Sequence, residues 1–173
     1  MAVVANIADL PNQAALLKNA RNALNTVCDP EIPVLTIEDL GVLRDVAIDD
    51  DGRVNVTITP TYSGCPAMNT ISMDVQTALA AAGFENVNVK LVLAPAWTTD
   101  WMSDEGRQKL LEYGIAPPAK GGTRGSLFGE AEIACPQCGS KNTEKLSEFG
   151  STACKALYRC KACMEPFDYF KCL

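Results

Sequence analysis

The sequence contains no histidine among its 173 residues. Histidine supplies the commonest metal-binding imidazole and the commonest general base near neutral pH. Its absence excludes Cys-His and Ser-His-Asp catalysis and restricts metal binding to thiolate and carboxylate ligands. Any metal chemistry of this chain must therefore use its eight cysteines and its acidic residues.

Positive charge and long apolar runs are also scarce. The formal net charge is −6 and the isoelectric point is about 4.7, which disfavours non-specific binding to nucleic acid. No apolar run has the length of a membrane span, and the N-terminal segment lacks the basic and apolar regions of a secretory signal. We therefore expect a cytoplasmic protein in a reducing compartment, with neither nucleic acid nor membrane as a partner.

The first part of the sequence has the pattern of a small α+β domain. Apolar and polar residues alternate over 54–58, the run Asp49–Gly52 before them is a strong hairpin-turn signal, and Ser103 is a good helix cap. The expected elements are a helix over 13–27, strands over 42–48 and 54–58, a helix over 66–82, a strand over 87–93 and a helix over 103–113. This order predicts helices packed on a small mixed sheet over residues 12–113.

A second module follows a change in composition. Residues 114–131 are rich in proline and glycine, which is typical of a linker, and residues 132–173 contain two C-x2-C pairs separated by 21 residues. The predicted metal ligands are the four sulfurs of these pairs: Cys135, Cys138, Cys160 and Cys163. Two tight turns that each present two thiolates form a tetrahedral cage. We predict a zinc-ribbon-like module with structural zinc, and leave open an iron or iron–sulfur centre, because such centres also use four thiolates.

Three other cysteines have no partner that the spacing reveals. Cys154 lies six residues before Cys160, Cys172 is the penultimate residue, and Cys28 follows the first predicted helix. Free cysteine is commonly buried, so the simplest interpretation of Cys154 and Cys172 is that they are small core side chains. The alternative is that they act as additional metal ligands or as a redox pair.

Cys65 stands alone in a Gly-Cys-Pro turn between the second predicted strand and the second predicted helix. Pro66 suits the first helical position, which makes Cys65 the expected N-cap. The free amides at a helix start would lower the pKa of the thiol there and favour thiolate. Thr61 adds a hydroxyl to the same segment. Cys65 could therefore bind a soft metal or act as a nucleophile, or it could simply be a buried cysteine at a turn.

Acidic and aromatic residues flank this turn in the predicted fold. Asp29 and Glu31 follow the first helix, and their loop could reach the turn that carries Cys65. Alternatively, Asp29 only organises an Asx-turn, and Asp39 is a solvated loop acid. The two tryptophans, Trp97 and Trp101, are expected to anchor the core or an interface.

The segments Asp29-Pro-Glu-Ile-Pro, Leu40-Gly and Thr59-Pro-Thr-Tyr-Ser-Gly-Cys-Pro together resemble a known family. It is the SufT-like, MIP-eighteen-type family of domains linked to iron–sulfur protein maturation, and the match covers residues 12–113. The resemblance implies an α/β domain in which Cys65 contacts iron or a cluster, with the acids of the Asp-Pro-Glu segment nearby.

The C-terminal half resembles a narrower family. Ala94-Pro-Ala-Trp-Thr-Thr-Asp-Trp-Met, Tyr113-Gly-Ile-Ala-Pro-Pro, Cys135-Pro-Gln-Cys-Gly-Ser and Glu165-Pro-Phe-Asp-Tyr-Phe-Lys-Cys are similar to segments of the D subunits of bacterial phenylacetyl-CoA epoxidase systems. Those systems epoxidise the ring of phenylacetyl-CoA in aerobic phenylacetate catabolism, at a di-iron centre in another subunit. The resemblance therefore implies an accessory component that is not itself catalytic.

The resemblance also implies a role and partners. The first hypothesis is iron or iron–sulfur cluster assembly for partner subunits through Cys65, with the other epoxidase subunits or iron–sulfur assembly proteins as partners; a homodimer stays open. The alternative is an electron-transfer component with redox-active iron on Cys135, Cys138, Cys160 and Cys163. An independent enzyme is disfavoured, because the sequence has neither histidine nor a phosphate-binding glycine loop.

Overall fold

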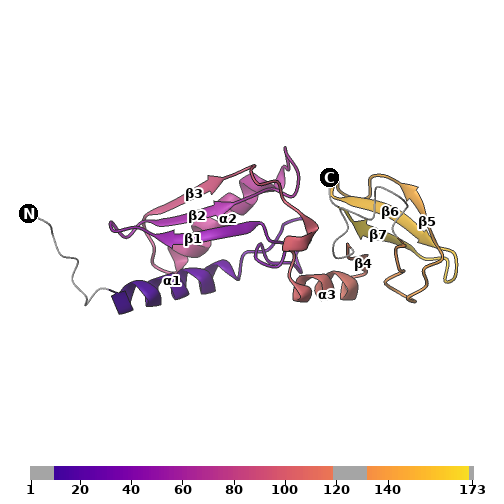
Figure 1. Ribbon diagram of the computed structural model, residues 1–173, viewed down its shortest axis with the longest axis horizontal. Coiled ribbons are helices and arrows are strands. Elements are labelled where there is room, and N and C mark those ends of the chain that lie inside the picture. The colour runs from indigo at the N-terminus through magenta and orange to yellow at the C-terminus, as the bar shows by residue number, and fades with distance from the viewer. Residues whose placement is uncertain (1–9, 119–131, 172–173) are drawn as a thin grey trace, which may run out of the picture.

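The computed structural model describes residues 10–118 and 132–171. Two helices and a three-stranded sheet form one end of an elongated molecule, and a four-stranded sheet forms the other end (Figure 1). Helix α3, Asp104–Glu112, lies between the two sheets. Within the described ranges, no helix combines the length and apolar character needed to cross a membrane. The α+β class and the separate cysteine module predicted from the sequence are confirmed.

The first sheet is mixed, with the order β1-β2-β3. Strands β1, Leu43–Ile48, and β2, Val54–Ile58, pair antiparallel through the predicted hairpin, whose Gly52 has a φ of +75°. Strand β3, Val87–Leu91, pairs parallel with β2. A parallel pair needs a crossover connection, which helix α2, Ala67–Ala81, provides.

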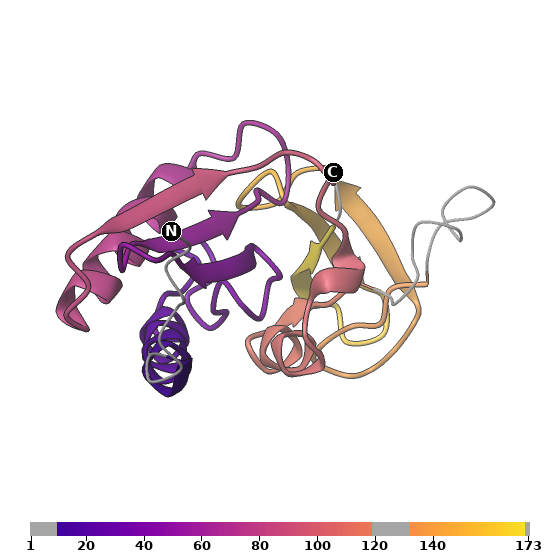
Figure 2. The same ribbon diagram turned by 60° about the vertical axis from the view of Figure 1, so that its left-hand side comes forward.

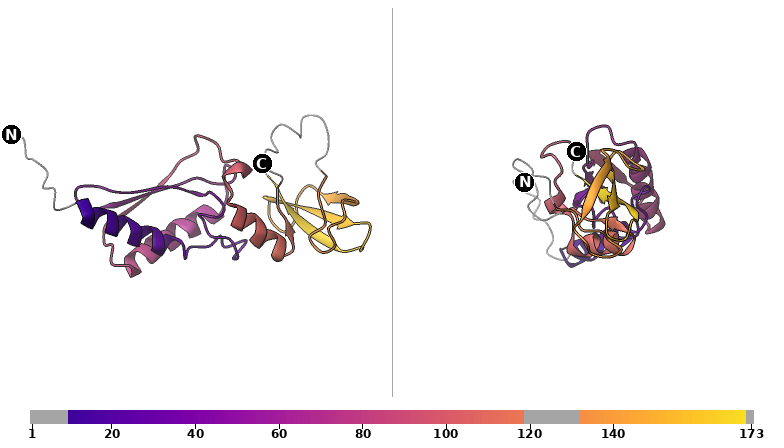
Figure 3. Two further views of the ribbon diagram at one scale, coloured as in Figure 1. Left: turned by 60° about the horizontal axis from the view of Figure 1, so that its bottom comes forward. Right: turned by 90° about the vertical axis from the view of Figure 1, so that its right-hand side faces the viewer.

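Helix α1, Leu10–Leu24, and helix α2 contact each other and cover the same face of the first sheet (Figures 2 and 3). The alternate residues of β2, Val54, Val56 and Ile58, are buried beneath them. Helix α1 ends three residues earlier than the sequence pattern predicts. The amides of Thr26 and Val27 bond to carbonyls only three residues back, which tightens the last turn and ends the α-helix.

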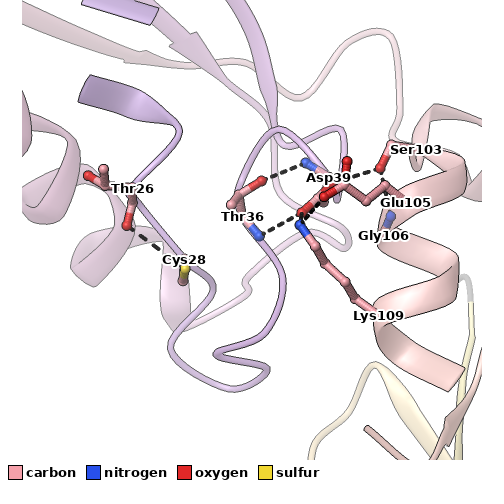
Figure 4. Close-up of polar contacts among 8 residues, drawn as sticks. All are labelled: Thr26, Cys28, Thr36, Asp39, Ser103, Glu105, Gly106 and Lys109. Atoms are coloured by element: carbon pink, nitrogen blue, oxygen red, sulfur yellow. Dashed lines mark hydrogen bonds and ion pairs between the residues drawn. The ribbon is translucent and has the colours of Figure 1, made fainter. Parts of the chain in front are cut away.

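Asp39, in the loop before β1, fixes α3 to the part of the chain that contains the first sheet (Figure 4). Its carboxylate accepts hydrogen bonds from Ser103 Oγ at 2.8 Å and from Lys109 Nζ at 2.8 Å, and its backbone oxygen accepts one from the Ser103 amide at 2.9 Å. Ser103 caps α3 as predicted, since its hydroxyl accepts the Gly106 amide at 2.8 Å. Although burial opposes ionisation of Asp39, the hydrogen bonds from Lys109 and Ser103 outweigh it and lower the pKa of the carboxyl. The interpretation of Asp39 as a solvated acid is therefore wrong.

The second sheet has the order β4-β7-β6-β5. Its strands are β4, Ile115–Ala116; β5, Thr143–Ser147; β6, Lys155–Cys160; and β7, Pro166–Phe170. Strand β4 falls inside the segment predicted as a linker and pairs parallel with β7, so the ordered structure extends past residue 114. The rest of that segment, residues 119–131, lies outside the described residues.

The two sheets are joined by a packed apolar contact. Trp97 is buried, donates its indole N–H to the Leu40 carbonyl at 2.8 Å, and meets the ring of Phe170 edge-on with centroids 6.0 Å apart. Phe170 and Cys154 belong to the hydrophobic core of the first domain, although both are residues of the cysteine module. Trp97 is therefore an interface anchor, as the sequence predicts.

Candidate functional site

The four cysteines of the C-x2-C pairs converge at one end of the second sheet, and we call this group the thiolate cage. Their sulfur atoms all lie within 4.8 Å of one another. Cys135 Sγ and Cys163 Sγ are 3.7 Å apart, and Cys138 Sγ and Cys160 Sγ are 3.6 Å apart. Zinc–sulfur bonds of about 2.3 Å in a tetrahedron give sulfur–sulfur edges of about 3.8 Å. The described geometry therefore fits a single tetrahedral metal ion.

The surroundings of the cage lower the pKa of Cys160 and raise the pKa of Cys163. The amides of Cys163 and Ala162 donate to Cys160 Sγ and lower the pKa of that thiol to about 6. The Glu165 amide acts in the same direction on Cys163, but desolvation and the neighbouring sulfurs raise the pKa of Cys163 to about 12. Four thiolates this close repel one another, so their joint ionisation requires a cation at the centre.

Both turns place the residue after the second cysteine in the left-handed region. Gly139 has a φ of +73°, which glycine adopts without strain. Met164 has a φ of +67° at the equivalent place in the second turn. The sequence gives no signal for Met164, because a non-glycine residue in this conformation is uncommon.

Cys154 and Cys172 are the predicted additional ligands of the cage, and the structure describes only Cys154. Cys154 lies just before β6, whereas Cys160 is the last residue of that strand. Six residues of extended chain span about 20 Å, which separates Cys154 from the cage. Cys154 is therefore not a ligand of that ion, and Cys172 lies outside the described residues.

Cys65 is half-buried just before α2, but it is not the N-cap of that helix. Pro66 occupies the cap position with helical dihedral angles, φ −68° and ψ −23°, and helix α2 begins at Ala67. The Ala67 amide still donates to the Cys65 sulfur, and the Tyr62 hydroxyl also bonds to it. Burial outweighs these hydrogen bonds, and with the charge of Glu31 it raises the pKa of the Cys65 thiol. The expectation of a lowered pKa is therefore wrong.

Asp29 and Glu31 are near enough to Cys65 for their charges to act on its thiol. Asp29 is buried, and its Oδ1 accepts the amides of Glu31 at 2.8 Å and Ile32 at 2.9 Å, so it organises the loop as well. Burial raises the pKa of Asp29, while those two amides and the charge of Lys155 act against the rise. Both acids act electrostatically on the Cys65 thiol.

Two residues that the sequence did not assign to this site also belong to the group. Cys154 Sγ is 3.8 Å from Glu31 Oε2, and the charges of Cys65, Glu31 and Cys154 all act on Tyr62. We call Asp29, Glu31, Tyr62, Cys65 and Cys154 the thiol–carboxylate cluster. Tyr62 could have been chosen from its place in the turn, but Cys154 comes from a distant segment and has no local signal. Thr61 is half-buried in the same loop.

Two separate segments of the chain match different family models. Residues 17–91 match the family described as "Iron-sulfur cluster assembly protein". Residues 119–171 match the family described as "PaaD zinc beta ribbon domain". The two matches do not overlap, and the four cage cysteines lie within the second.

Relatives and a solved structure agree with this division. The chain is 53% identical to the putative D subunit of 1,2-phenylacetyl-CoA epoxidase of Escherichia coli, over 87% of this chain and 89% of the relative. It is 41% identical to "Fe-S protein maturation auxiliary factor" of Porphyromonas gingivalis, over 53% of this chain and 85% of the relative. A crystal structure of domain of unknown function DUF59 from Bacillus anthracis has a TM-score of 0.54 and 29% identity, covering 58% of this chain and 96% of that one. Both resemblances inferred from the sequence are confirmed.

Proposed function

Since the chain belongs to the family of phenylacetyl-CoA epoxidase D subunits, we propose that it assembles or delivers iron or iron–sulfur cargo for other subunits of that system. The observation that carries the proposal is the position of Cys65 beside Asp29 and Glu31. All three residues lie in the half of the chain that matches the iron–sulfur cluster assembly family. The same half is related to a maturation auxiliary factor, which supports an accessory role.

The chemistry of Cys65 suits a site that binds its cargo reversibly. Its thiol is protonated near neutral pH when no cation is bound, because burial and the nearby carboxylates raise its pKa. An arriving soft cation displaces that proton, and the charges of Asp29 and Glu31 then favour the cation. Cys65 is only half-buried, so an incoming ion and a partner protein can reach it.

We propose that the thiolate cage holds a structural zinc ion, which Cys135, Cys138, Cys160 and Cys163 would bind. Four thiolates at these spacings suit zinc, and the family description of this module names zinc. When bound, the ion would neutralise the crowded thiolates and hold the two turns together. The module would then keep β6 and β7 in place against the first domain.

Growth of a deletion strain on phenylacetate tests the proposal. A strain that lacks this protein should regain growth with the wild-type chain but not with Cys65→Ser, although that variant should be folded and zinc-loaded. Cys28→Ser is the matched control, because Cys28 is also a half-buried free thiol, and its sulfur faces the Thr26 carbonyl at 3.8 Å (Figure 4). Full growth with Cys65→Ser would overturn the proposal.

A further inference from the structure

Cys154 belongs to the cysteine module by sequence but to the first domain by packing. Its side chain is only 5% exposed and lies in the core of the first domain together with Phe170. Tyr62 and Cys65 pack against this same core, whereas Cys135 and Cys160 of the cage belong to the separate core of the second sheet. The fold therefore inserts one thiol of the second module into the cluster of the first domain.

Glu31 connects this thiol to Cys65. Its Oε2 atom is 3.8 Å from Cys154 Sγ, and its charge also acts on the Cys65 thiol. Burial raises the pKa of Cys154, and the charges of Glu31 and Asp29 raise it further. Cys154 thus contacts Glu31, and Glu31 acts on Cys65 through its charge, although the three residues come from segments that are far apart in the chain.

We propose that Cys65, Cys154 and Glu31 together form an interdomain site for a thiophilic divalent metal ion such as ferrous iron. The inference rests on the proposed function for the nature of the cargo, and it adds Cys154 as the second sulfur ligand. Two thiolates and one carboxylate are ligands that such ions accept, and three protein ligands leave a coordination position open for exchange.

The geometry suits a transient site better than a structural one. Among the described residues, only the four cage cysteines hold their ligand atoms within 4.8 Å of one another. The side chains of the interdomain site must therefore rotate towards a common centre when an ion binds, and this movement weakens binding relative to the cage. Weak binding is what a donor site needs. Lys155, which is buried next to Cys154 and 3.8 Å from Asp168, partly balances the negative charge of the cluster.

Anaerobic titration of the full-length, zinc-loaded protein with cobalt(II) tests the site. Cobalt(II) bound by thiolate gives a charge-transfer absorption whose intensity increases with the number of sulfur ligands. The wild type should bind one cobalt ion without losing its zinc. Cys154→Ser and Cys65→Ser should each lower the absorption to about half and weaken binding at least about tenfold. Cys28→Ser should match the wild type.

The outcomes separate this inference from the proposed function. If Cys154→Ser and Cys154→Ala both bind cobalt as the wild type does while Cys65→Ser does not, the second ligand is refuted and the role of Cys65 stands. If Cys65→Ser also binds normally, both proposals fail. Serine at position 154 could disturb folding, because Cys154 lies in the core; Cys154→Ala keeps an apolar group there. Thermal unfolding of both variants shows whether either substitution disturbs the fold.

Discussion

At the scale of single residues, opposing effects decide whether the Cys65 thiol is protonated. The start of a helix favours a thiolate at Cys65, and the Ala67 amide acts in that direction. Removal from water and the carboxylate of Glu31 act in the other direction and prevail. Cys65 therefore carries a proton rather than a reactive negative charge, and metal binding must release that proton.

The first prediction concerns the pH dependence of metal binding. The pKa of Cys65 is raised, so its thiol is protonated at neutral pH and each bound ion displaces a proton from it. The apparent affinity for cobalt(II) should therefore rise by about tenfold per pH unit for each thiol displaced. Titrations at several pH values between about 6 and 8 measure this slope. A flat profile would contradict the assignment of protonated thiols as ligands.

At the scale of elements, the two sheets depend on different forces. The first sheet is held by apolar side chains beneath two helices, whereas the second has a small core and a metal cage at one end. The turns of the cage crowd four sulfurs together, which is unfavourable without a cation. The cysteine module should therefore depend on its metal much more than the first domain does.

The second prediction follows from this difference. Cys135→Ser and Cys160→Ser each remove a buried cage ligand, so both variants should lose the metal and become sensitive to protease within residues 132–171. The wild type should be colourless and contain one zinc ion per chain. Elemental analysis and limited proteolysis provide the measurements, with Cys28→Ser as the control. A coloured, iron-containing protein that bleaches on reduction would support electron transfer instead of structural zinc.

The sequence predicted the local features of this molecule well. The hairpin at Asp49–Gly52, the Ser103 cap and the cage follow from short-range spacing, and the structure contains all three. The predictions that failed needed knowledge of three-dimensional surroundings. The pKa of Cys65 depends on burial that a motif does not reveal, and the environment of Asp39 depends on α3, which lies more than sixty residues away in the sequence.

At the scale of the whole molecule, the two domains form one unit through a buried contact. Phe170 is only 1% exposed and packs on Trp97, and the Lys171 amide bonds to the Cys154 carbonyl at 2.9 Å beside them. This contact holds Cys154 next to Glu31. The sequence predicts Trp97 as an anchor but does not predict its partner, because Phe170 comes from a distant segment and meets Trp97 only in the folded chain.

The third prediction tests this contact. Phe170→Ala leaves a cavity at the interface and should lower the free energy of unfolding by about 3–5 kcal/mol. It should also reduce cobalt binding at the interdomain site while the zinc content stays the same. Phe149→Ala is the control, because Phe149 is 59% exposed and its loss should change stability by less than about 1 kcal/mol. Denaturant unfolding gives both values, and equal effects of the two substitutions would contradict a packed interface.

We propose that Cys65 delivers iron or iron–sulfur cargo to other epoxidase subunits. The most direct test is the iron and acid-labile sulfide content of those subunits, purified from cells that carry the wild-type chain, Cys65→Ser or Cys28→Ser. We expect metal-depleted subunits with Cys65→Ser and fully loaded subunits with the wild type and Cys28→Ser. Fully loaded subunits in the cells with Cys65→Ser would contradict it.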